Sequence, residues 1–202
     1  MKRLFVVFFL IVVLCKPSAA DDFQEVDRLI RTTVNTVLKI SRTTDLNREL
    51  KKEQIMAVVT RVFNLPLMAK LTLGPKHWGK LSGKQREDFT DLFIKQMQST
   101  YFGQVELAAD ATVQFEEPFG VNNKIHIKTL AISKDEPIKI LYKLYKGRGA
   151  WRVYDVEIQD VSIVKSYGMQ YNEILQNGTY EDLIGKIKAK IRQNDKATPK
   201  ND

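Results

Sequence analysis

The spacing of apolar residues changes twice along this chain, and that change limits the possible folds more than any other feature. Up to about residue 111, and again from about residue 162, apolar side chains recur at helical spacing. Between Thr112 and Val156 they alternate with polar residues, as in strands that bury one face. Helices grouped before and after a run of strands predict an α+β domain rather than alternating helices and strands.

The alternating region divides into four runs, which we interpret as a four-stranded antiparallel sheet with one apolar face. The turn at residues 147–149 joins the last two runs and is typical of a β-hairpin. In the helical region, Ser82 and Gln85 form the sequence pattern of a capping box, which predicts the start of a long helix. The four runs are Val113–Phe115, Ile125–Thr129, Ile138–Leu144 and Trp151–Val156.

The N-terminus has the pattern of a cleavable secretory signal peptide. Basic residues precede an unbroken apolar run, Leu4–Cys15, and the small residues Ser18–Ala20 follow it. A membrane anchor is the alternative, but this run has 12 residues, whereas a membrane-spanning helix needs about 20. We therefore expect residues 1–20 to be removed by cleavage after Ala20 and the protein to work in the periplasm.

The mature chain then forms one domain over residues 21–192, followed by a polar tail, 193–202, that we expect to be disordered. It has no cysteine, because the single Cys15 lies in the leader, so disulfide and thiol chemistry are excluded. The leader takes three basic residues with it, which lowers the formal net charge from +8 to +5. This mild excess fits contact with anionic membranes and is too weak to indicate nucleic-acid binding.

No motif for catalysis, cofactor binding or metal binding emerges. The chain lacks a Gly-x-Ser-x-Gly elbow, a Walker loop and a dinucleotide fingerprint. His77 and His126 are far apart in the sequence, and His126 falls on the outer face of a strand. Asp155 and Asp160 could form an acid pair for proton transfer, but we interpret them as turn and cap residues before a helix beginning near Ser162. We expect no catalytic residue, metal or cofactor.

The pattern of apolar residues is compatible with either a solid core or a core that encloses a cavity. A curved sheet with helices across its mouth can leave an apolar cavity, and acyl chains in it gain about 0.8 kcal/mol for each buried CH₂. Such a site binds its ligand with few polar contacts, so the sequence carries no motif for it.

Two stretches carry more specific packing patterns. Residues 63–74 (FNLPLMAKLTLG) precede Trp78, and Trp151–Val156 leads through Val161–Val164 into the last helical region. In both, the chain resembles the MlaC (toluene-tolerance) family of periplasmic phospholipid-binding proteins. The likeness covers nearly all of the mature chain, with departures at Asn64 and Gly168, where the family usually has an acid and an arginine.

This resemblance implies a helical layer wrapped on the curved sheet, as in nuclear-transport-factor or cystatin-like cones, enclosing an apolar cavity. It implies a bound phospholipid as cargo, with its tails inside. It also implies two partners, an outer-membrane lipoprotein complex and an inner-membrane ABC transporter with a lipid-binding subunit. Shuttling between them would maintain the lipid asymmetry of the outer membrane.

Combining the resemblance with strand alternation, we expect the cavity to be lined by inward strand positions and by one stripe of the long helix. Two other functions stay open: a small exported enzyme acting on an apolar substrate, and a solid-core periplasmic assembly or binding module. The expected lining residues are Val113, Phe115, Ile127, Ile140, Tyr142, Leu144 and Val153 from the strands, and Phe89, Phe93, Met97 and Tyr101 from the helix.

Overall fold

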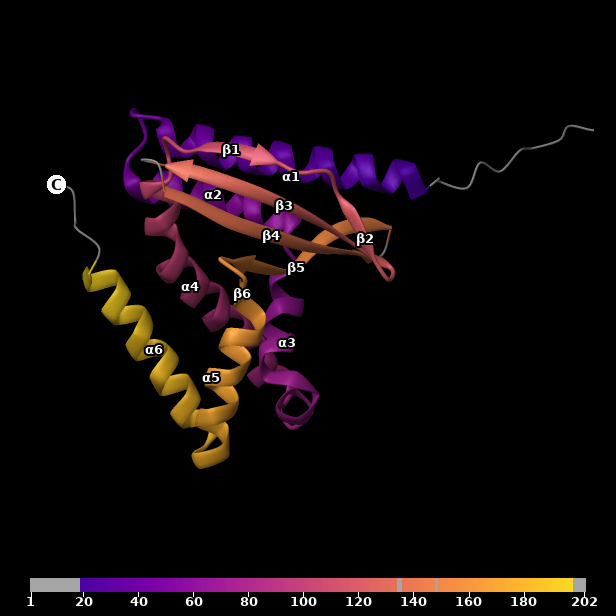
Figure 1. Ribbon diagram of the computed structural model, residues 1–202. Helices are drawn as coiled ribbons and strands as arrows, with labels where there is room; N and C mark the ends of the chain where they lie inside the picture. The colour runs from indigo at the N-terminus through magenta and orange to yellow at the C-terminus, as the bar shows by residue number, and fades with distance from the viewer. Residues whose placement is uncertain (1–18, 134–135, 148, 198–202) are drawn as a thin grey trace, which may run out of the picture.

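Four helices precede an antiparallel sheet and two follow it in the computed structural model, which describes residues 19–133, 136–147 and 149–197 (Figure 1). The expected α+β class is thus confirmed. Residues 1–18, which belong to the expected leader, and residues 198–202, the end of the expected tail, lie outside the described residues. The helices are α1 (Ala19–Arg42), α2 (Arg48–Val62), α3 (Leu65–Trp78), α4 (Gly83–Leu107), α5 (Ile163–Asn177) and α6 (Tyr180–Ala197). The strands are β1 (Thr112–Phe115), β2 (Phe119–Val121), β3 (Lys124–Ser133), β4 (Glu136–Gly147), β5 (Ala150–Ile158) and β6 (Val161–Ser162).

Local side-chain capping decides where several helices begin. The Ser82 hydroxyl accepts a hydrogen bond from the Gln85 amide while the Gln85 side chain accepts one from the Ser82 amide, so the predicted capping box is present at α4. Asn47 and Asn64 cap α2 and α3 in the same way, through their side-chain oxygens. At the other end, α6 continues to Ala197, five residues past the domain boundary that we expected at residue 192.

The sheet has the order β1-β3-β4-β5-β6, and every pairing within it is antiparallel. The four predicted strands correspond to β1, β3, β4 and β5. Two short strands add to them: β2 pairs with β3, and β6 pairs with β5 just before α5. A register shift between Lys143 and Leu144 marks a β-bulge in the β4–β5 ladder.

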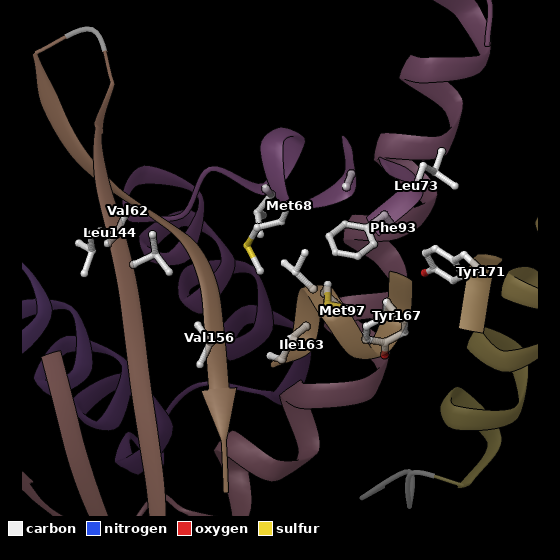
Figure 2. Packing of buried hydrophobic residues seen from close by; sticks show 14 of the residues in the cluster. Val62, Met68, Leu73, Phe93, Met97, Leu144, Val156, Ile163, Tyr167 and Tyr171 are labelled. Atoms are coloured by element: carbon white, nitrogen blue, oxygen red, sulfur yellow. The ribbon is translucent and has the colours of Figure 1, made fainter. Parts of the chain in front are cut away.

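The core lies between one face of the sheet and the helices, and it continues among α3, α4 and α5. Figure 2 shows Leu144 and Val156 on the strands, with Met68, Phe93 and Met97 reaching toward the centre from α3 and α4. These residues belong to one cluster of buried apolar side chains. None of the described helices is both long and apolar enough to cross a membrane.

The close approach of α3 and α5 depends on Gly168. A Cβ atom at this position would lie 3.3 Å from the backbone oxygen of Thr72 on α3. We expect Gly168→Val to force the helices apart and to lower the free energy of unfolding by about 1–3 kcal/mol. Urea denaturation measures this change. Gly185→Val on α6 is the matched control, because a Cβ there meets nothing within 4 Å; equal losses in the two variants would contradict the packing argument.

Candidate functional site

The inner face of the sheet, meaning the face turned toward the helices, collects the strand residues that alternation selected. Directly paired residues of neighbouring strands share a face. Phe115 pairs with Thr129, which pairs with Ile140, and Ile127 pairs with Tyr142. All seven strand positions expected to line a cavity therefore lie on this one face: Val113, Phe115, Ile127, Ile140, Tyr142, Leu144 and Val153.

Burial is uneven across the inner face. Ile127, Leu144 and Val153 are completely buried beneath the helices. Phe115 and Ile140, which flank Thr129 across the ladder, are only half-buried although they are apolar and point to the same side. Val113 and Tyr142 are half-buried as well. The inner face thus has a sealed part and a part that keeps accessible surface.

Tyr142 combines burial with remaining accessible surface. Burial raises the pKa of its phenol to about 12, because surrounding protein atoms disfavour the charged phenolate. Its side chain nevertheless retains accessible surface. Tyr142 is thus a desolvated phenol beside the half-buried part of the inner face.

Two of the four expected helix positions lie in a different part of the core. Phe89 and Phe93 on α4 are completely buried, and their rings contact Tyr171 and Tyr167 of α5 at centroid distances of 5.8 and 6.1 Å. Figure 2 shows Phe93, Tyr167 and Tyr171 together in the layer between α4 and α5. This aromatic cluster packs helix against helix, so Phe89 and Phe93 have the surroundings of ordinary core residues.

Met97 and Tyr101 lie farther along the same stripe of α4. Met97 is 9% exposed and joins the buried core. Tyr101 is half-buried, and desolvation raises the pKa of its phenol. Of the four helix positions, Tyr101 is therefore the one that combines desolvation with accessible surface in the manner of Tyr142.

Helices α1 and α2 contribute apolar side chains that the expected set omitted. Val34 of α1 and Met56 of α2 are half-buried and pack against the same core. Arg31 of α1 places its guanidinium carbon 4.7 Å from the centre of the Phe115 ring. Helical periodicity marks Val34 as inward-facing, but it cannot show which part of the sheet α1 crosses.

Asp155 lies on the outer face of the sheet and is fully engaged there. One carboxylate oxygen accepts hydrogen bonds from Lys143 at 3.1 Å and Ser162 at 2.8 Å, and the other accepts from the Val164 amide at 3.2 Å. Lys143 also pairs with Glu157. Burial opposes the charge of Lys143, but hydrogen bonds to Glu157 and Asp155 outweigh it and raise the pKa of Lys143. Asp155 thus stabilises the start of α5, as its cap interpretation predicted.

The outer face also holds His126, which is 9% exposed and lies under the ring of Phe119 at 5.6 Å. Its Nε2 atom has no hydrogen-bond partner among the described residues. Desolvation, followed by the nearby positive charge of Lys143, lowers the pKa of this imidazole. His126 therefore resists protonation in the folded protein.

This shift predicts a pH-dependent stability. An unfolded histidine titrates near pH 6.5, above the lowered pKa of folded His126, so between these values the unfolded chain binds the proton. The free energy of unfolding should fall as the pH drops through about 6.5 and level off below the folded pKa. Urea midpoints between pH 7.5 and 5 should decline less in His126→Phe than in the unmodified protein. His77→Gln, which removes the other histidine, is the control, and a full decline in His126→Phe would contradict the assignment.

No group of three or more side chains able to hold a metal ion occurs among residues 19–133, 136–147 and 149–197. The described polar clusters instead serve as caps and cross-strand pairs, as at Asp155 and Lys143. What the arrangement offers chemically is an apolar inner face that is completely buried in one part and only half-buried in another.

Comparisons with known proteins identify a family and a similar fold. The model of the family described as MlaC protein matches residues 31–189. Among solved structures, the chain is similar to the phospholipid-binding protein from Ralstonia solanacearum in complex with a phospholipid. The TM-score is 0.75 at 20% identity, over 83% of this chain and 97% of the other, which shows a common fold. A comparison with curated proteins gave no match.

Proposed function

Because this chain belongs to the MlaC family, whose model matches residues 31–189, we propose that it is a periplasmic phospholipid carrier. The acyl chains occupy the space beside the inner face of the sheet. The fold that it shares with the phospholipid-binding protein of Ralstonia solanacearum supports this assignment.

The observation that carries the proposal is that part of the apolar inner face stays only half-buried beneath the helices. Tyr142 lies on this face, and burial raises the pKa of its phenol to about 12. Phe115 and Ile140 border the same region and are apolar and half-buried. An enclosed, water-poor, apolar space suits hydrocarbon chains, because each CH₂ moved there from water contributes about 0.8 kcal/mol.

The lining of this space is part of the proposal. We assign to it Val113, Phe115, Ile140 and Tyr142 from the strands and Tyr101 from α4, with Val34 and Met56 opposite them. Ile127, Leu144 and Val153 form its sealed floor, since they lie on the same face and have no exposed surface. Phe89, Phe93 and Met97 support it from behind as packed core.

The cellular role follows from a carrier of this kind. The leader, residues 1–20, directs export and is removed, and the mature protein passes phospholipid between an outer-membrane lipoprotein complex and an inner-membrane ABC transporter with a lipid-binding subunit. Such transfer would maintain the asymmetry of the outer membrane. The protein acts by binding and not by catalysis, and its ligand is cargo rather than a cofactor.

Native mass spectrometry of the purified protein, followed by organic extraction, tests the binding step. We expect a mass surplus that resolves into two-tailed phospholipids. A bare polypeptide mass that stays unchanged after incubation with phospholipid vesicles would contradict the proposal and favour the solid-core assembly module.

A further inference from the structure

A pocket of about 630 Å³ lies between the first half of α1 and the segment that joins β1 to β2. Its walls include Phe23, Asp27, Arg28 and Arg31 of α1, with Glu117 opposite them. The charged groups number two of each sign, which distinguishes the pocket from a simple anion site. We asked what kind of molecule would use both signs at this place.

The pocket adjoins the accessible part of the inner face. Arg31 lines the pocket, and its guanidinium carbon lies 4.7 Å from the centre of the Phe115 ring. Phe115 in turn is joined through Thr129 to Ile140 across the ladder. A molecule with its hydrocarbon part against Phe115 and Ile140 can therefore place a polar end in this pocket.

The two arginines retain donors for such a polar end. Arg31 uses its Nε atom to donate to both carboxylate oxygens of Asp27, at 2.8 and 2.7 Å. Within the described residues its two terminal nitrogens make no hydrogen bond, and Arg28 is exposed without a hydrogen bond or ion pair. Guanidinium groups bind phosphate oxygens through paired N–H donors.

The two carboxylates of the pocket limit the class of head group that it can bind. Asp27 is held by Arg31, and this hydrogen bond raises the pKa of the guanidinium. Glu117 is exposed on the opposite wall, makes no ion pair among the described residues and acts on Arg31 only at longer range, where its charge adds to that rise in pKa. A head group that carries only a phosphate would meet Glu117 as a like charge. A head group that also carries an ammonium group can place its phosphate at Arg28 and Arg31 and its ammonium at Glu117.

We propose that this pocket receives the head group of a zwitterionic aminophospholipid, with the phosphate at Arg28 and Arg31 and the primary ammonium at Glu117. The assignment rests on the proposed phospholipid-binding function and adds a preference among phospholipids. The preference is moderate, because pairs between exposed charges contribute little. We expect phosphatidylethanolamine to be favoured over phosphatidylglycerol by about two- to fivefold.

The test offers the purified protein equimolar vesicles of phosphatidylethanolamine and phosphatidylglycerol and measures by native mass spectrometry which lipid it takes up. Glu117→Lys should reverse the preference, because it replaces the ammonium partner with a second phosphate partner. Glu116→Lys is the control: it makes the same charge change at the neighbouring exposed residue, which does not line the pocket and whose carboxylate lies 3.9 Å from the exposed ammonium of Lys128. The control should keep the unmodified ratio.

The outcomes separate the two levels of the proposal. If the protein and both variants take up the two lipids in one common ratio, the head-group site is wrong and the carrier function stands. If Glu116→Lys shifts the ratio as much as Glu117→Lys, general surface charge is responsible and the site is again wrong. If the folded protein takes up neither lipid, the carrier function and the head-group site both fail. Circular dichroism checks that the variants are folded.

Discussion

Asp155→Ala is expected to lower the free energy of unfolding by about 3 kcal/mol. The substitution removes one partner of a Lys143 side chain that is only 12% exposed, and it leaves the Ser162 hydroxyl and the Val164 amide without their acceptor. Glu157 still pairs with Lys143 in this variant. The expected loss therefore lies at the lower end of the range of about 3–5 kcal/mol that is typical when one partner of a buried ion pair is removed. Urea denaturation followed by circular dichroism measures the change.

Glu53→Ala provides the comparison for this loss. Glu53 is an exposed carboxylate on α2, and its removal should change the free energy of unfolding by no more than about 0.5 kcal/mol. A similar result for Asp155→Ala would mean that the outer-face cluster stabilises little.

Asp155→Asn addresses the enzyme alternative through the same residue. It keeps an acceptor oxygen and removes the charge needed for proton transfer, so a catalytic Asp155 would lose its activity while a capping Asp155 would not. We expect the folded Asp155→Asn protein to bind as much phospholipid as the unmodified protein. Complementation of a lipid-asymmetry defect by this variant would leave the enzyme alternative without its best candidate residue.

The second large effect is expected at Ile140, where Ile140→Glu should reduce bound phospholipid by more than about tenfold. An ionised carboxylate in a water-poor space costs several kcal/mol, and each 1.4 kcal/mol corresponds to a factor of ten in affinity. Phospholipid per protein after organic extraction is the measurement. Leu141→Glu is the matched control, since Leu141 is the next residue of β4, equally half-buried, and lies on the outer face.

Ile140→Trp separates an open space from a filled core at the same position. In an open space the indole is accommodated, so the thermal midpoint should change little while bound phospholipid decreases. In a filled core the larger side chain would overpack and cost about 1–3 kcal/mol. A strongly destabilised Ile140→Trp protein would therefore support the solid-core module over the carrier.

Alternation along the sequence determined the sheet to a large extent. It identified β1, β3, β4 and β5 and the side to which Phe115, Ile127 and Tyr142 point, because the side-chain period of a strand is a local property of the backbone. The capping box at Ser82 was equally visible, since both of its hydrogen bonds join residues three positions apart. These features depend on residues close together in the chain and can therefore be predicted from the sequence.

The bulge opposite Lys143 and Leu144 was decided by tertiary structure. Strict alternation along β5 would send Val153 and Asp155 to the same face. The bulge adds a residue between them, so Val153 faces inward opposite Leu144 and Asp155 faces outward opposite Lys143. A bulge is set by the partner strand and by the α5 cap that Asp155 serves, and neither is local to β5.

The choice of helices around the apolar space was likewise beyond local pattern. The stripes of α1, α2 and α4 look alike in the sequence, but Phe89 and Phe93 pack on the tyrosines of α5, whereas Arg31 of α1 reaches Phe115. The sequence by itself determined the fold class and the inward strand positions. Only the tertiary structure decided which helix covers which part of the sheet and that Arg31 lies beside the apolar inner face at Phe115. The reason is that the placement of a helix depends on contacts between residues far apart in the chain.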